Sequence, residues 1–213
     1  VIELLTIPKI YGGAIYFDGA DAAGLLRAWR DWAADLPREA STSAALMRLP
    51  EMPGVPPVLA GKLTLAVRFA TASDADIAAG MLAPMRAVAT PLLDGVATIP
   101  YAAIGAVHAD PPVPMPALEA STLLRDFTDG TIDAIVSAAG PQSSSPLGIV
   151  EVRQFGGALT DEQAVRSALC HRDSAFQLFA VGILAPPIAD LVPAAVAELL
   201  AAVGPWSTGT SLP

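Results

Sequence analysis

Residues 62–70 alternate between apolar and more polar side chains, and this pattern constrains the fold of the chain more than any other. The apolar side chains are Leu63, Leu65, Val67 and Phe69. The side chains between them are Lys62, Thr64, Ala66 and Arg68. Successive side chains of a strand point to opposite faces, so one face of this strand is buried and the other is more open. Such a strand is typical of an antiparallel sheet with helices on one side.

Strand character recurs along the chain, which gives about seven predicted strands. They are Tyr11–Phe17, Ala40–Leu49, Lys62–Ala70, Leu92–Thr98, Leu118–Leu124, Leu147–Phe155 and Ala175–Leu184. The proline-rich segments 50–61 and 109–116 interrupt this series. Their short length indicates loops within one domain rather than linkers between two.

Four helices are predicted where apolar residues recur every three or four positions. Asp21, Ser73 and Thr128 are the expected N-caps of the first three, and Pro84 is expected to kink or end the second. The fourth is expected from about Ala189 to Val203. The expected inward faces of the first three are Leu25, Trp29, Trp32 and Leu36; Ile77, Met81 and Met85; and Ile132, Ile135 and Ala139.

The order of these elements is β-α-β-β-α-β followed by β-α-β-β-α. The first half matches the split β-α-β pattern of ferredoxin-like proteins, and the second half looks like a diverged copy of it. We therefore expect an α+β fold, in which one extended antiparallel sheet of about seven strands carries helices stacked on one face.

Composition excludes several classes of partner. The formal net charge is −9, with 12 Lys+Arg against 21 Asp+Glu, so nucleic acid and anionic membrane surfaces are not expected partners. No apolar run reaches the length of a membrane span and no signal peptide is visible, so we expect a cytoplasmic protein. Only 15% of residues are charged, which indicates either an alanine-rich core or a face covered by another domain.

The single cysteine, Cys170, excludes an internal disulfide and a metal site built from several cysteines. We interpret it as a small buried apolar residue. The two histidines, His108 and His171, lie far apart in the sequence and make poor metal ligands without cysteines, so no metal site is predicted.

The predicted strand 147–155 carries the clearest candidate site. Val150 and Val152 should face the helices, so Glu151 and Arg153 should point from the other face. Two opposite charges at this spacing can form a solvated ion pair on an open sheet. Alternatively, they form a polar patch in a substrate pocket.

Glycines and a histidine follow this strand. Gly156 and Gly157 allow a sharp turn or the close approach of a flat ligand, although a simple bulge would also need them. His171 and His108 each have two interpretations, as a residue of the site or as a residue that orders its loop. No nucleophile-elbow or dinucleotide-binding motif is visible.

Six segments of the chain, taken together, resemble a known family. The segments are Gly13–Phe17, Leu25–Trp32, Pro100–Pro111, Val150–Ala158, Cys170–Asp173 and Gly204–Gly209. Their order and spacing resemble the substrate-binding domain of the berberine-bridge-type, vanillyl-alcohol-oxidase-like FAD-linked oxidoreductases of the actinobacterial type. The resemblance covers nearly the whole chain.

This resemblance implies that residues 1–213 form a substrate-binding (cap) domain. The FAD-binding domain and a final return segment would lie elsewhere in the same polypeptide, so FAD would be bound mainly outside this chain. The chain would contribute to oxidation of a small organic substrate by hydride transfer to flavin N5, and by itself it would be inactive. Its oligomeric state is left open.

The resemblance also implies roles for particular residues. Glu151, Arg153 and Phe155 would face the flavin, with Gly156 and Gly157 ending their strand and His171-Arg172 opening the next. The position that holds the catalytic base in such oxidases corresponds to Ala180, which cannot act as a base. Tyr101 is the one local candidate to replace it.

A second hypothesis belongs to a different class of function. The chain could be a free-standing, non-enzymatic small-molecule-binding module of ferredoxin-like design that dimerises through its open sheet face.

Overall fold

The structure, a computed structural model, describes residues 6–110, 114–159 and 171–209. Within these residues the strands form one antiparallel sheet in the order β4-β1-β3-β2-β7-β8-β6, and β5 also pairs with β1. The strands are β1 Lys9–Asp18, β2 Ala40–Arg48, β3 Leu63–Thr71, β4 Leu93–Asp94, β5 Ala97–Pro100, β6 Ala117–Leu124, β7 Ile149–Gln154 and β8 Phe176–Ile183.

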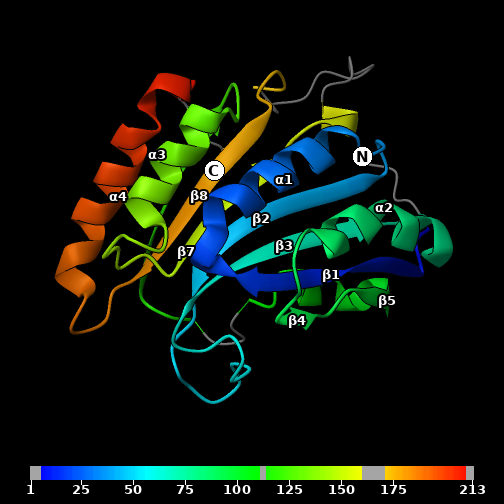
Figure 1. Ribbon diagram of the computed structural model, residues 1–213, viewed down its shortest axis with the longest axis horizontal. Coiled ribbons are helices and arrows are strands. Elements are labelled where there is room, and N and C mark those ends of the chain that lie inside the picture. The colour runs from blue at the N-terminus through cyan, green and yellow to red at the C-terminus, as the bar shows by residue number, and fades with distance from the viewer. Residues whose placement is uncertain (1–5, 111–113, 160–170, 210–213) are drawn as a thin grey trace.

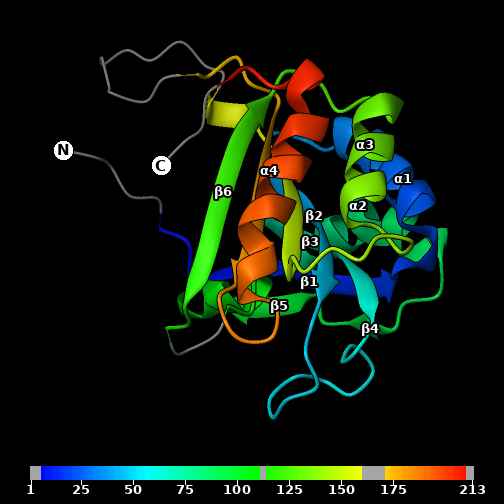
Figure 2. The same ribbon diagram turned by 90° about the vertical axis from the view of Figure 1, so that its left-hand side faces the viewer.

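The α-helices all pack on one face of this sheet, as the two views of Figures 1 and 2 show. They are α1 Ala22–Ala34, α2 Ala75–Val88, α3 Asp129–Ala139 and α4 Val192–Ala202. The predicted α+β class, with helices on a single face of an extended antiparallel sheet, is confirmed.

The sheet consists of two similar halves. The first runs β1-α1-β2-β3-α2 and is followed by β4 and β5, and the second runs β6-α3-β7-β8-α4. This is the predicted order of elements, with the last strand of the first half divided in two. In each half the third strand lies between the first and the second, and the two halves meet where β2 pairs with β7. The strand order is therefore symmetric about the β2–β7 seam.

The sheet has eight strands rather than about seven because the predicted strand Leu92–Thr98 is divided. It forms β4 and β5, separated by Gly95 and Val96. The Asp94 carboxylate accepts hydrogen bonds from the Val96 amide (3.0 Å) and from Arg86 Nε (2.7 Å), which turns the chain between the two strands.

Helix ends follow the predicted capping residues with one exception. Asp21 accepts from the Gly24 amide at 3.1 Å, and Thr128 forms a capping box with Thr131. The second helix is different: its N-cap is Asp74 and not Ser73, and its chain continues past Pro84 to Val88.

The predicted inward face of α2 was also wrong at one position. Ile77 is 58% exposed, whereas Ala78, Leu82 and Met85 are buried. A small alanine contributes little to an apolar pattern, so the sequence pattern favours the more hydrophobic Ile77 over Ala78 as the inward residue. The third helix buries Ile132, Ile135 and Ala139 as predicted.

Trp29 of α1 forms the centre of the core between the helices and the sheet. It is fully buried and makes edge-on contacts with Phe127 (5.6 Å between ring centroids) and Phe176 (6.2 Å). Its indole Nε1 donates to Thr42 Oγ1 at 3.0 Å. Because Phe127 and Phe176 belong to the second half, this tryptophan joins the two halves on the helix side.

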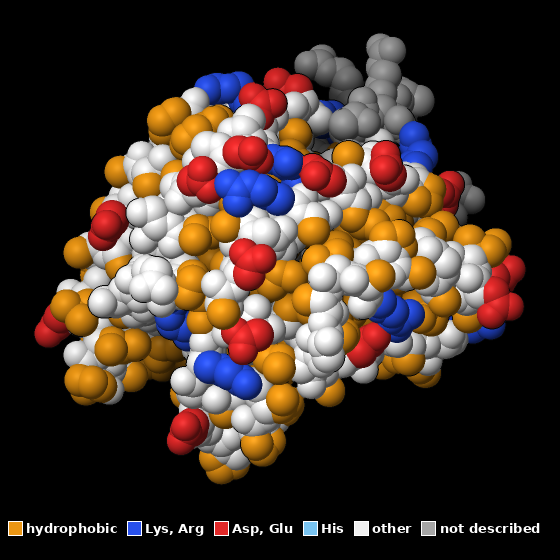
Figure 3. Space-filling view, in the orientation of Figure 1, with side chains coloured by type: hydrophobic (Ala, Val, Ile, Leu, Met, Phe, Trp, Pro, Cys, Tyr) orange, Lys and Arg blue, Asp and Glu red, His pale blue; other side chains and the backbone are white. Residues whose placement is uncertain are grey.

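The outer surface of the helices carries acidic and basic side chains scattered among apolar ones (Figure 3). Ion pairs link α1 to α3 there, including Arg27 with Asp133 and Arg30 with Asp129. Exposed pairs of this kind contribute little to stability, so the packing beneath them holds the helices in place.

Glycine substitutions test the packing of β1 against the turn between β4 and β5. Gly13 has φ +148°, and a Cβ atom there would lie 2.4 Å from the Gly95 carbonyl oxygen. We expect Gly13→Ala to lower the free energy of unfolding by roughly 1–3 kcal/mol, measured by urea denaturation. Gly80→Ala in α2, where the new methyl meets nothing within 4 Å, should raise it by about 0.5–1 kcal/mol. Equal stability of the two variants would contradict the close approach.

Candidate functional site

The sheet face opposite the helices carries polar side chains that lie in register. Ser43 of β2 is opposite Arg68 of β3 on one side and Arg153 of β7 on the other, and Arg153 is opposite Gln177 of β8. Directly opposed residues of antiparallel strands share a face. These four side chains therefore form one row across the seam between the two halves.

Glu151 lies on the same face, two residues before Arg153 in β7, and accepts hydrogen bonds from three residues of this row. Its Oε1 accepts from Arg68 Nη1 and from Ser43 Oγ, each at 2.6 Å. Its Oε2 accepts from Nε of Arg153 at 3.0 Å and pairs with Nη2 of the same residue at 2.8 Å. The carboxylate is only 1% exposed and its hydrogen-bonding capacity is filled.

The two arginines differ in exposure. Arg68 is 3% exposed, and its Nε is buried without a hydrogen-bond partner in the described part of the chain. The side chain of Arg153 is 35% exposed, and its guanidinium carbon lies 4.7 Å from the centre of the Phe179 ring. One cation is thus buried beneath the face while the other reaches its surface.

His108 approaches the same carboxylate from outside the sheet. It follows the short helix η2 (Tyr101–Val107), which contacts β1 and β3. Its Nδ1 lies 3.9 Å from Glu151 Oε1, and its side chain is 38% exposed. We refer to Ser43, Arg68, Glu151, Arg153 and His108 as the arginine–glutamate cluster.

The cluster fixes the charge of its members. Burial by itself would raise the pKa of Glu151, but Arg68, Ser43 and Arg153 hold that pKa below its ordinary value. Burial lowers the pKa of His108, and the charge of Arg68 lowers it further. At neutral pH the cluster therefore contains two cations, one anion and a neutral imidazole.

Tyr16 of β1 also lies on this face, beside a small apolar cluster with Ala45, Met47 and Ala66. Leu59 of the loop 50–61 packs on the same cluster and covers it. Burial raises the pKa of the Tyr16 phenol, an effect that Arg68 opposes. This hydroxyl is therefore protonated at neutral pH.

Ala180 does not lie on the face that carries Glu151. It is opposite Val150 in the β7–β8 pairing and is fully buried in the core beneath the helices. The resemblance matched Ala180 to the catalytic-base position of a substrate pocket on the open face, and this match is wrong in register. Phe179, the preceding residue, is opposite Glu151 and occupies the open face instead.

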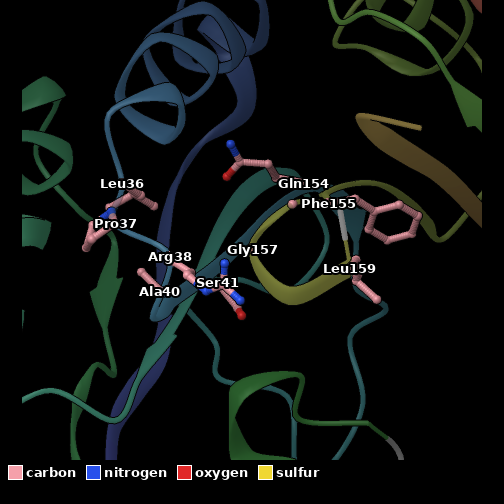
Figure 4. Close-up of a pocket in the computed structure, with 10 residues that line it drawn as sticks. Leu36, Pro37, Arg38, Ala40, Ser41, Gln154, Phe155, Gly157 and Leu159 are labelled. Atoms are coloured by element: carbon pink, nitrogen blue, oxygen red, sulfur yellow. The ribbon is translucent and has the colours of Figure 1, made fainter. Parts of the chain in front are cut away.

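Phe155, Gly156 and Gly157 line a separate hollow of about 340 Å³ at the end of β7, shown in Figure 4. Gly157 has φ +54°, and a Cβ atom there would lie 3.1 Å from the Arg38 carbonyl oxygen. The glycine therefore lets two loops pack closely. The other residues that line the hollow are Leu36, Pro37, Arg38, Ala40, Ser41, Gln154 and Leu159.

The remaining sequence-predicted residues lie outside the cluster. Tyr101 begins η2 and is 47% exposed. His171 is exposed with φ +55°, and Arg172 Nη1 donates to the Leu159 carbonyl at 3.0 Å, across the two loops that flank residues 160–170. Cys170 lies outside the described residues.

Sequence reasoning missed Ser43, Arg68 and Phe179 as neighbours of Glu151, and Tyr16 as a residue of the same sheet face. A signal for Arg68 was present, because an arginine in the middle of an alternating strand, on the less apolar side, must find a partner or water. The β2–β7 pairing that brings Ser43 and Arg68 to Glu151 joins residues more than 80 positions apart. No local pattern reports such a pairing.

The described part of the chain holds no group of three or more His, Cys, Asp or Glu side chains that could bind a metal ion. No helix in that part has the length and apolar character needed to span a membrane.

Comparison with solved structures yields consistent likenesses of fold. The 6-hydroxy-D-nicotine oxidase of Arthrobacter nicotinovorans superimposes with a TM-score of 0.72 at 19% identity, over 95% of this chain and 44% of the oxidase. BBE-like 1 of Physcomitrella patens superimposes with a TM-score of 0.72 at 12% identity, over 96% of this chain and 45% of that protein. For the berberine bridge enzyme the corresponding values are 0.73, 11%, 98% and 44%.

The chain shares its fold with one part of these proteins. It spans less than half of their length, and at such low identity the likeness concerns the fold. No protein-family model and no curated protein matches the sequence.

Removal of the Glu151 charge tests the cluster. Glu151→Gln leaves two arginines without their anion, and we expect it to reduce the free energy of unfolding by about 3–5 kcal/mol. Asp129→Asn is the matched control, because it removes a carboxylate from an exposed ion pair on the helix face. Chemical denaturation of both variants should show a large loss for the first only. A near-neutral Glu151→Gln would contradict the burial of a charged network.

The depressed pKa of Glu151 predicts a pH dependence of stability. Its ion pairs contribute fully above the pKa of glutamate in the unfolded chain, about 4.3. That contribution is lost as the pH falls through the lower folded-state value. Below about pH 4.3, the free energy of unfolding should therefore fall more steeply for the wild type than for Glu151→Gln. Parallel pH profiles of the two proteins would exclude this linkage.

Proposed function

We propose that this chain is the substrate-binding domain of an FAD-dependent oxidoreductase, with the FAD-binding domain in another part of the same polypeptide. The arginine–glutamate cluster carries the proposal, because a buried network of charged side chains is held on the sheet face opposite the α-helices. The fold, shared with part of an oxidase and of the berberine bridge enzyme, supports it.

The open face fits a position against a flavin in two respects. In the part of the chain that the structure describes, the α-helices pack on the other face of the sheet. Four of the five cluster residues, all except His108, are positioned by strand pairing. FAD, when bound, would supply the hydride acceptor at N5 of its ring. The sequence shows no glycine-rich phosphate-binding motif, so the diphosphate of FAD would be held by the other domain.

In this function the residues of the open face bind and orient the substrate. Arg153 presents a cation that lies over the aromatic ring of Phe179. The helices on the other face hold the strands in place and exclude water from that side of the sheet. The domain thus fixes the position of a substrate C–H bond relative to the flavin.

His108 is better placed than Tyr101 to accept a proton from the substrate. It is partly exposed beside the cluster and its lowered pKa keeps the imidazole neutral at neutral pH. A neutral imidazole can take up a proton in a reaction, and Glu151 nearby stabilises the resulting cation. Burial and the charge of Arg68 disfavour the protonated imidazole, and the lowered pKa of His108 would therefore set the pH range in which it acts.

The domain assignment is tested by flavin binding. The isolated 213-residue chain, refolded or purified with excess FAD, should retain no flavin by absorbance after gel filtration. The polypeptide that joins it to an FAD-binding domain should retain flavin and show oxidase or dehydrogenase turnover. Stoichiometric FAD in the isolated chain would refute the assignment. A stable dimer of the chain, formed through its open face, would instead favour a free-standing binding module.

The proton-acceptor assignment is tested in the flavin-containing protein. His108→Gln should lower kcat/KM roughly 10²- to 10⁴-fold and abolish the acidic limb of its pH profile. Tyr101→Phe is the control, because it removes a hydroxyl from η2 outside the cluster, and it should keep both the rate and the profile. The assignment fails if Tyr101→Phe shows the larger loss.

A further inference from the structure

The arginine–glutamate cluster contains more hydrogen-bond donors than acceptors. Each guanidinium offers five N–H groups. Within the described residues, Arg153 uses only Nε and Nη2, both toward Glu151. Arg68 uses Nη1 toward Glu151 and makes one long contact from Nη2 to the Met47 sulfur at 3.8 Å.

The single anion of the cluster has no capacity for these remaining donors. Glu151 already accepts from Arg68, Ser43 and Arg153 with both of its oxygens. Arg68 Nε is buried and has no hydrogen-bond partner among the described residues. Buried polar groups are nearly always paired in folded proteins, so an unpaired donor of a buried cation needs an explanation.

The cluster also contains more positive than negative charge. Two guanidiniums face one carboxylate, and the imidazole of His108 adds no charge at neutral pH. Within the cluster the arginines therefore carry one positive charge more than Glu151 balances, in a protein whose formal net charge is −9. Arg153 brings it to the surface, since Arg153 is the exposed member of the pair.

We propose that the arginine–glutamate cluster binds the carboxylate group of a small organic acid, with Arg153 as the direct contact and Arg68 as the buried supporting charge. A carboxylate matches the planar fork of a guanidinium and carries the single negative charge that the cluster lacks. Phe179, beneath the Arg153 guanidinium, gives the ligand an apolar surface next to the charge. This inference names the substrate class of the proposed oxidoreductase, and so rests on that function.

The binding test uses the isolated chain and three probes, which are sodium benzoate, benzyl alcohol and inorganic phosphate. The readout is the set of arginine Nε–Hε signals in a ¹H–¹⁵N NMR spectrum, and the signal absent from Arg153→Gln identifies that side chain. Benzoate should shift the Arg153 signal saturably, whereas benzyl alcohol at the same concentration should not. Phosphate should bind more weakly than benzoate.

Variants separate a carboxylate site from a purely structural ion-pair network. Arg153→Gln should weaken benzoate binding roughly 10- to 100-fold, which is the usual effect of losing a charge-assisted hydrogen bond. Arg153→Lys should recover part of that loss because it restores the charge. Arg30→Gln, in an ion pair on the helix face, is the matched control and should bind as the wild type does.

Glu151→Gln should strengthen benzoate binding, whereas Arg153→Gln should weaken it. It removes the anion that competes for both guanidiniums, so benzoate should bind several-fold more tightly. If that variant does not fold, the Arg153 series alone decides. The proposal is overturned if benzoate leaves the arginine signals unshifted, if benzyl alcohol shifts them equally, or if Arg153→Gln binds benzoate normally. None of these results would affect flavin binding by the longer polypeptide, so failure of the carboxylate site is distinguishable from failure of the oxidoreductase assignment.

Discussion

The pairing of β2 with β7 is the contact on which the rest of the molecule depends. It joins the strands of the two similar halves into one sheet, with an edge strand of one half paired to an edge strand of the other. Trp29 reinforces the seam on the helix side through Phe127 and Phe176. Glu151 reinforces it on the other side by binding Ser43 and Arg68 of the first half. The seam is thus stabilised by aromatic packing on the helix side of the sheet and by ion pairs and hydrogen bonds on the opposite side.

Several features of this arrangement could be predicted from local sequence. The alternation in residues 62–70 placed Arg68 on the open side, and alternation in 147–155 separated Val150 from Glu151. Capping residues Asp21 and Thr128 also signalled their helices correctly. These predictions succeed because a strand or a cap depends on neighbours within a few positions.

Other features were out of reach because they depend on distant pairing. The seam decides that Glu151 meets Ser43 and Arg68, and no periodic signal reports which edges of two half-sheets will join. Ala180 was misplaced for a related reason. A count along the chain cannot fix a register, and an error of one residue moves a side chain to the opposite face of a strand. The pairing of Ala180 with Val150 shows the true register.

The alternation of faces has a consequence for how such a protein can change over evolution. Residues that hold the helices and residues that face outward occupy alternate positions of the same strands, so the outward set can vary while the packing set is kept. Thr42 links the packing set to the backbone of an outward-facing residue, since its hydroxyl accepts from Trp29 and donates to the main-chain carbonyl of Arg68 at 2.7 Å. A scaffold of this kind can acquire new ligand preferences by substitutions along one side of its strands. Its tolerance should be lowest near Thr42, where a change on one side is transmitted to the other.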